Sequence, residues 1–330
     1  MQSSVKRTVK VSLGFLLTVV LFWFLFRKLD FQSFAEYLKK GNKLLILLGI
    51  LLYISSFAIR GLRWKVIIGK LADFKLCDLS MFTVSGYAIN NILPVRLGEF
   101  ARAWIAGNGN SLGASGALAT IFVERVFDGL TITLILVVTL LAYPFQAEMQ
   151  QIALIAAAIF GALFCFIIFG TFSDIPLRIL RFFRSKSPKF ALFLFDIAEK
   201  FLNGAATLRS FRRIAAVLLL SFAVWAVELS LYLLVSAAFD VNIPFAGYLV
   251  MLCAANLGML AAPTPGGLGV FQSAIVLALE SFAIVYEKRM AVALIIHLSQ
   301  IVPITIIGII WLNLKGISIS GIVKEEKSAD

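Results

Sequence analysis

The chain has 330 residues, of which 61% are hydrophobic, and a mean hydropathy of +0.96 leaves too few polar side chains to cover a soluble globule. A net charge of +12 could indicate nucleic-acid binding. However, the basic residues lie in short segments between long apolar runs, which is typical of loops facing anionic lipid headgroups. We therefore predict an integral membrane protein that does not bind nucleic acid.

The chain divides into apolar runs that can be compared with the thickness of a bilayer. A helix needs about 20 apolar residues to cross the hydrocarbon core. Two apolar regions, 79–106 and 245–283, are interrupted in the middle by proline and glycine. The sequence therefore predicts an all-α polytopic membrane bundle with two broken, re-entrant hairpins and about six full spans, which are 11–28, 44–60, 113–143, 151–172, 213–238 and 290–313.

We expect one integral membrane domain over residues 1–330, built from two halves. Half A covers 1–172 and contains the hairpin 79–106, and half B covers 213–313 and contains the hairpin 245–283. The basic segment 173–212 connects them.

The distribution of lysine and arginine predicts the orientation in the membrane, because short basic loops stay in the cytoplasm. The segment 173–212 and both termini then lie inside, whereas 144–150 and 240–246, which lack lysine and arginine, lie outside. The cytoplasmic membrane of a prokaryote is the expected location. The basic segment 27–43 falls outside by this count. It could form an interfacial amphipathic helix with Phe31, Phe34, Ala35 and Leu38 on one face, and its orientation is left open.

The heptapeptides PVRLGEF (94–100) and PGGLGVF (265–271) share the pattern P-x-x-L-G-x-F about half a chain length apart. In the predicted topology the first hairpin enters from the cytoplasm and the second from outside. This arrangement indicates an inverted repeat, and transporters with such repeats bind substrate near the midplane, where broken helices meet. Two unrelated helix breaks are the alternative.

The first tip combines a helix start with charged side chains. A half-helix beginning after Pro94 directs unpaired N–H groups and the positive end of its dipole toward the membrane interior. Arg96, Glu99 and Arg102 follow on one face, and two guanidinium groups suit a phosphate. Glu99 can hold the arginines apart or take up a proton. The alternative is an interfacial ion-pair cluster without a ligand.

The second tip offers backbone in place of charge. Its prolines and glycines leave the main chain accessible, so that a headgroup can approach the N–H groups closely. The tip consists of Pro263, Thr264, Pro265, Gly266, Gly267 and Gly269.

Further ionisable residues lie inside predicted spans, where they are costly and usually functional. In FVERVFDGL (122–130), Glu124, Arg125 and Asp128 have helical spacing, and we expect them to be buried. The alternative is a cytoplasmic cap on a span that starts near Gly129. Glu228 is expected to face the bundle, and it and His297 are candidates for coupling. A lone histidine is more often a packing residue than a proton relay.

The motifs NNILPVRLGEFAR, FVERVFD and APTPGGLGVFQ, in this order, resemble the flippase-like transmembrane family that includes the membrane portion of lysylphosphatidylglycerol synthase. The resemblance implies transport between leaflets of an anionic lipid, such as a phospholipid or a polyprenyl-phosphate-linked glycolipid. The family often has a glutamate where this chain has Gln272. The substrate-binding residues that the resemblance implies are Asn91, Pro94, Arg96, Gly98, Glu99, Arg102, Glu124, Arg125, Asp128, Pro263, Pro265, Gly266, Gly267 and Gly269. Thr264 and Gln272, which lie in or beside the second tip, complete the predicted site.

Two other functions compete with lipid transport. An intramembrane enzyme acting on a lipid phosphate would need a general acid or a nucleophile, and His297 and Glu124 are the candidates. A non-catalytic membrane partner of a glycosyltransferase or lipid synthase is the third class, and a partner that is a second copy of the chain is also left open. Cys77, Cys165 and Cys253 are too far apart to indicate a metal site, and no cofactor is expected.

Overall fold

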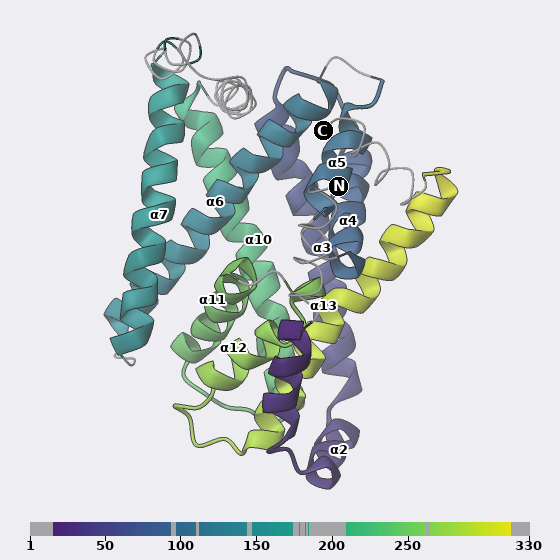
Figure 1. Cartoon of the computed structure of the whole chain (residues 1–330), viewed down its shortest axis with the longest axis vertical. Coiled ribbons are helices and arrows are strands. Elements are labelled where there is room, and N and C mark those ends of the chain that lie inside the picture. Colours follow the sequence, from purple (N-terminus) through teal and green to yellow (C-terminus); the bar gives the residue numbers. More distant parts are fainter. Residues whose placement is uncertain are drawn as a thin grey trace. The chain divides into compact units, whose positions relative to one another are not determined.

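The computed structural model describes residues 16–93, 97–109, 112–143, 147–173, 178, 182, 184, 209–261 and 264–317. The described elements are helical (Figure 1). Four of the described helices are long and apolar enough to cross a membrane: α3 (Lys43–Ile68), α6 (Gly113–Ala142), α10 (Phe211–Ala238) and α13 (Tyr286–Leu314). With the shorter apolar helices, they confirm the prediction of an all-α polytopic membrane protein.

The shorter helices complete the described fold. An apolar helix covers Leu16–Phe26, and α7 (Ala147–Phe172) packs beside α6 (Figure 1). The segment that the sequence left open contains α2 (Phe31–Lys40), with Phe34 buried and both Lys39 and Lys40 in its last turn. Asp30 caps α2, and the hydroxyl of Ser33 and the N–H of Gln32 hold the pKa of its carboxyl below the usual range.

Both proline- and glycine-containing regions are interrupted helices. The first consists of α4 (Leu76–Ile92) and α5 (Gly98–Gly107), and the residues between them include Pro94 and Arg96, which lie outside the described part. The second consists of α11 (Phe245–Ala261), the short 3₁₀ helix η2 (Pro265–Gly267) and α12 (Val270–Ala278), and α11 and α12 pack against each other. Pro263 is also outside the described residues.

The chain forms two compact units. Unit 1 comprises the described residues within Met1–Ser56, Val84–Gly98 and Ala226–Ile319, and unit 2 those within Phe57–Thr83 and Glu99–Trp225. Each unit draws on both halves of the sequence, because α3, α4 and α10 each contribute residues to both units.

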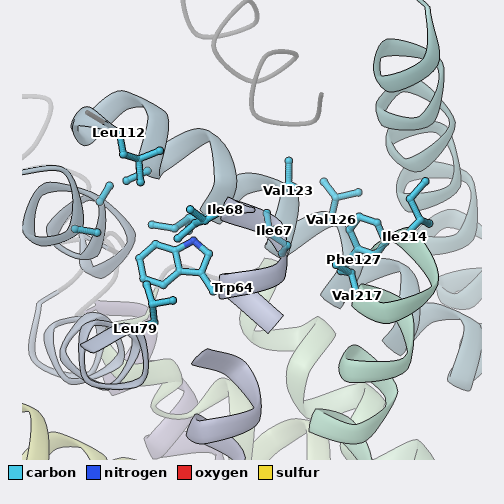
Figure 2. Packing of buried hydrophobic residues seen from close by; sticks show 14 residues of the cluster. Trp64, Ile67, Ile68, Leu79, Leu112, Val123, Val126, Phe127, Ile214 and Val217 are labelled. Atoms are coloured by element: carbon cyan, nitrogen blue, oxygen red, sulfur yellow. The ribbon is translucent and has the colours of Figure 1, made fainter. Parts of the chain in front are cut away.

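The core of unit 2 is apolar and surrounds one tryptophan. Trp64 of α3 is fully buried among Ile67, Ile68 and Leu79, while Phe127 of α6 lies in the same cluster (Figure 2). The indole N–H of Trp64 donates to Thr120 Oγ1 over 2.9 Å, which satisfies the one polar atom of this side chain. This packing fixes α3 against α6 at the depth where the charged residues of both helices occur.

Candidate functional site

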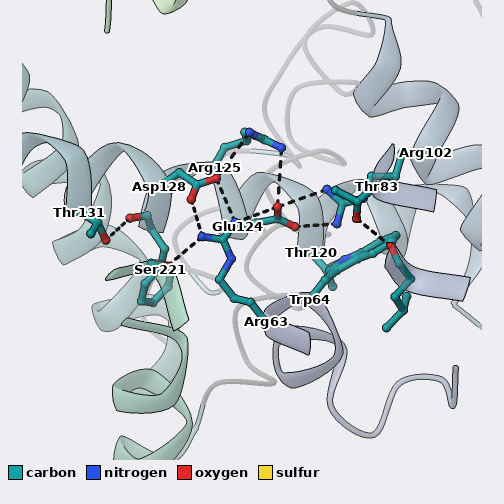
Figure 3. Close-up of polar contacts among 12 residues, drawn as sticks. Arg63, Trp64, Thr83, Arg102, Thr120, Glu124, Arg125, Asp128, Thr131 and Ser221 are labelled. Carbon is teal, nitrogen blue, oxygen red and sulfur yellow. Dashed lines mark hydrogen bonds and ion pairs between the residues drawn. The ribbon is translucent and has the colours of Figure 1, made fainter. Parts of the chain in front are cut away.

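A buried cluster of arginines and carboxylates lies within unit 2 (Figure 3). Its centre is Glu124 of α6, whose side chain is fully buried. Arg63 Nη2 lies 3.0 Å from Glu124 Oε1, and Arg102 Nη2 lies 2.7 Å from Glu124 Oε2. Both oxygens of the carboxylate are thus held by guanidinium groups, which is the pairing that allows charges to be buried.

Arg63 of α3 connects the two carboxylates of α6. One of its terminal nitrogens donates to Glu124, and the guanidinium also forms a two-point contact with both oxygens of Asp128. Arg63 Nη1 donates in addition to Ser221 Oγ of α10 over 2.9 Å. The parts of α3, α6 and α10 that belong to unit 2 therefore meet at one guanidinium.

Arg102 of α5 is held from two directions. Its guanidinium donates to Glu124, and its Cζ atom lies 3.7 Å from the centroid of the Trp64 ring. Stacking on an aromatic face uses none of the guanidinium N–H groups. Trp64 therefore fixes the side chain of Arg102 and leaves its donor edge directed at the carboxylate.

The cluster has a more accessible edge formed by Arg125 and Glu99. Their side chains are 32% and 22% exposed, and Arg125 Nε lies 3.9 Å from Glu99 Oε1. Arg125 Nη2 also lies 3.7 Å from Glu124 Oε1, and Arg125 Nη1 lies 3.5 Å from Asp128 Oδ2. Arg125 therefore links the buried carboxylates to a partly exposed side of the cluster.

Five of the residues predicted at the candidate site come together in one cluster in the structure: Glu99, Arg102, Glu124, Arg125 and Asp128. Glu124 lies well inside a continuous helix that begins at Gly113, and it is fully buried. Arg96, predicted on the same face as Arg102, is outside the described residues.

Four members of this environment were missed: Arg60, Arg63, Trp64 and Ser221. The predicted span 44–60 was ended at the first arginine, whereas α3 continues to Ile68 and carries Arg60 and Arg63 into the helix, both buried. Their spacing of three residues was a usable signal, since it puts both guanidinium groups on one helical face.

The first break is closed by a short local contact within unit 1. The N–H of Gly98 donates to Asn90 Oδ1 over 2.7 Å, so this asparagine satisfies a donor at the start of α5. A Cβ atom at Gly98 would collide with the carbonyl oxygen of Gly86, one of the residues of α4. The chain therefore reverses at the break, and α5 begins against α4.

The end of α4 also lies close to the glycine turn, 264–269. A Cβ atom at Gly266 would lie 3.3 Å from the carbonyl oxygen of Asn91, near the end of α4. The side-chain amide of Asn91 donates to Thr305 of α13 over 2.9 Å. The end of α4 and the glycine turn therefore lie close together within unit 1, alongside α13.

The backbone of the glycine turn is largely satisfied by its own hydrogen bonds. The N–H of Gly267 donates to Thr264 O over 3.1 Å, that of Leu268 donates to Pro265 O over 3.0 Å, and that of Gly269 donates to Gln272 Oε1 over 2.9 Å. These three N–H groups are occupied in this conformation. A headgroup bound to them, as the sequence predicts, would have to replace internal bonds.

The two coupling candidates also lie in unit 1. Glu228 of α10 is buried, and its Oε1 accepts from Asn256 Nδ2 and from Gln300 Nε2, each over 3.3 Å. His297 of α13 is buried between Gly266 and Gln272. Within the described part of the chain, no group of three or more His, Cys, Asp or Glu side chains is placed to hold a metal ion.

Comparison with known proteins assigns the family. The sequence family of the lysylphosphatidylglycerol synthase transmembrane region matches residues 11–308. The chain therefore belongs to this family of membrane proteins. A UPF0104 membrane protein of Methanothermobacter thermautotrophicus is 25% identical over 282 residues, which cover 81% of this chain and 82% of that protein. The glycosyltransferase AglD of Haloferax volcanii is 27% identical over 158 residues, which cover 46% of this chain and 25% of that protein.

Proposed function

We propose that the protein moves an anionic lipid, either a phospholipid or a polyprenyl-phosphate-linked glycolipid, between membrane leaflets. The observation that carries the proposal is the arginine–carboxylate cluster buried between membrane helices. Ionisable groups at such positions are costly, and they commonly mark a substrate or ion pathway. Membership of the transmembrane-region family supports the same class of function.

The exchange of partners at the arginines is the proposed binding step. A phosphate presents oxygens at a spacing that a guanidinium can bind by two hydrogen bonds, as a carboxylate does. The headgroup would first meet Arg125, which is 32% exposed, and displace Glu99 from it. Arg102, held by its stacking on Trp64, could then turn its donors from Glu124 to the phosphate.

Two observations favour transport over an enzymatic reaction at a lipid phosphate. Both oxygens of Glu124 already accept from arginines, so this group is poorly placed as a general acid or as a nucleophile. Both ring nitrogens of His297 are also engaged, one by Gln272 and the other by Gly266. Service as a membrane partner of a glycosyltransferase is the second candidate, because a protein named as a glycosyltransferase matches over part of this chain.

The proposal is tested by reconstituting the protein in liposomes with fluorescent phosphatidylglycerol or with a short polyprenyl-phosphate-linked sugar. A quencher added outside reaches about half of the fluorescent lipid in a protein-free vesicle, because only the outer leaflet is accessible. With the protein present, we expect the quenched fraction of the fluorescence to exceed this half. Arg125→Ala should reduce the initial rate by about tenfold, the effect of about 1.4 kcal/mol of lost binding, and Arg125→Lys should lose less. Arg212→Ala, which removes an exposed arginine at the start of α10, is the matched control.

The outcomes separate the three functions. Wild-type transport by Arg125→Ala would overturn the assigned site. No transport of either lipid, together with release of phosphate or headgroup, would indicate an enzyme. Loss of a glycosyltransferase's activity on deletion of this protein, with neither transport nor release, would indicate a partner role.

A further inference from the structure

The glycine turn adopts a backbone conformation that needs an external restraint. Gly266, Gly267 and Gly269 have φ values of 56°, 72° and 83°, which side-chain-bearing residues rarely adopt. Glycine also allows many other conformations, so the sequence alone does not select this one. The two bonds within the turn, from Gly267 to Thr264 and from Leu268 to Pro265, are local, so a restraint from outside is needed to hold the turn against the rest of unit 1.

A chain of three hydrogen bonds supplies this restraint. The N–H of Gly269 donates to Gln272 Oε1 over 2.9 Å, Gln272 Nε2 lies 2.9 Å from His297 Nδ1, and His297 Nε2 lies 2.9 Å from the carbonyl oxygen of Gly266. This series of hydrogen bonds begins and ends in the turn and passes through His297 of α13. It therefore ties the turn to a long helix of unit 1.

The backbone donor and the backbone acceptor at the two ends of this series of hydrogen bonds determine which atom carries each proton. Because a backbone N–H can only donate, the Gln272 atom facing Gly269 is the oxygen, and the amide NH₂ faces the histidine. His297 Nδ1 must then accept. Because the carbonyl of Gly266 can only accept, His297 Nε2 must carry the proton.

We infer that His297 is a positioning residue, held by Gln272 as the neutral Nε2–H tautomer, which clasps the glycine turn to α13. A second ring proton would sit on Nδ1, directly opposite the amide hydrogens of Gln272. These two hydrogen bonds therefore hold the imidazole in one protonation state, and His297 does not carry protons for coupling. This inference stands independently of lipid transport, since it concerns only the conformation of the turn.

The surroundings of the ring agree with a fixed, neutral side chain. The imidazole is 2% exposed and stacks on Phe271 of α12, with ring centroids 4.2 Å apart and an interplanar angle of 6°. Its described polar contacts, to Gly266 and Gln272, are both uncharged. Glu228 of unit 1 is also buried, and its carboxylate accepts from Gln300, which lies three residues after His297 on α13.

The single histidine of the chain makes a direct test possible. The full-length protein, labelled with ¹⁵N-histidine and reconstituted in lipid, gives a nitrogen spectrum with one imidazole. We expect an unprotonated Nδ1 signal and a protonated Nε2 signal, both unchanged between about pH 5 and pH 8, where an ordinary histidine titrates. A protonated Nδ1, or a titration in this range, would overturn the inference.

Gln272→Glu tests the part assigned to the glutamine. An ionised glutamate can still accept from Gly269, but it can only accept from the histidine, so Nδ1 must become protonated. Once the glutamate is neutral, its O–H can donate as the glutamine does. We therefore expect the variant's imidazole spectrum to depend on pH.

The matched control is Gln151→Glu, which makes the same chemical change on the exposed surface of α7 and should leave the imidazole signals unchanged. A Gln272→Glu spectrum identical to wild type at every pH would contradict the role of Gln272. Because the readout is spectroscopic, it holds or fails whether or not the protein moves lipid.

Discussion

At the scale of single residues, Glu124 organises the charged cluster. Three arginines surround it, at 3.0 Å for Arg63, 2.7 Å for Arg102 and 3.7 Å for Arg125. Arranging charges in this way offsets the desolvation that burial imposes on each of them. Removal of the central negative charge would therefore leave buried cations facing one another.

We expect Glu124→Gln to destabilise the protein by about 3–5 kcal/mol, the range for breaking a buried ion pair by removing one partner. The measurement is thermal unfolding of the detergent-solubilised protein, followed by helical circular dichroism. Glu36→Gln is the control, because Glu36 and Lys40 form an exposed pair on α2, and such pairs contribute little. Equal unfolding temperatures for the two variants would show that the cluster contributes no stability.

At the scale of elements, the hairpin at the first break depends on close approach of two helices at glycine. A methyl group at Gly98 would collide with the carbonyl oxygen of Gly86, which is backbone and cannot rotate away. The start of α5 would have to move from α4 and would weaken the bond from Gly98 N–H to Asn90.

We therefore expect Gly98→Ala to lower the stability by about 1–3 kcal/mol, the usual cost of overpacking. Gly161→Ala is the comparison, because a Cβ atom at Gly161 of α7 meets nothing within 4 Å. There the substitution should be neutral or stabilising, since alanine favours a helix interior by about 1 kcal/mol relative to glycine. The free energy of unfolding of both variants is measured by denaturation in the same detergent. A Gly98→Ala variant as stable as the wild type would contradict the close contact.

The interrupted helices could be predicted from the sequence because proline and glycine inside an apolar run both disfavour a continuous helix. The clustering of Glu124, Arg125 and Asp128 was also predictable, since their spacing is local. Arg63 was missed because counting apolar residues ends a span at the first charge, although α3 continues beyond it. Its partners lie more than 60 residues away in sequence, and only tertiary packing reveals such contacts.

At the scale of the whole molecule, the sidedness of the helix ends follows from charge and stays a prediction. Basic loops are retained in the cytoplasm, and this places the start of α10 inside and its end outside. Lys70, after α3, should then lie inside, and Asn242, after α10, should lie outside. Both residues are exposed, so reagents can reach them.

Single cysteines at these positions check the orientation, in a variant whose three native cysteines are replaced. A membrane-impermeant maleimide should label Asn242→Cys in right-side-out vesicles and Lys70→Cys in inverted vesicles. Labelling of both positions from one side would contradict the predicted topology and, with it, the inverted relationship of the two hairpins.

The sharing of α3, α4 and α10 between the units limits how the protein can change shape. The chain passes from one unit to the other inside these helices, at Ser56 and Phe57 of α3 and at Thr83 and Val84 of α4. Ser56 and Thr83 each donate to a carbonyl of the preceding turn, over 2.6 Å and 2.8 Å, a bond that often accompanies curvature in helices. A movement of one unit would thus require α3 and α4 to bend at these positions, because no flexible loop connects the units there.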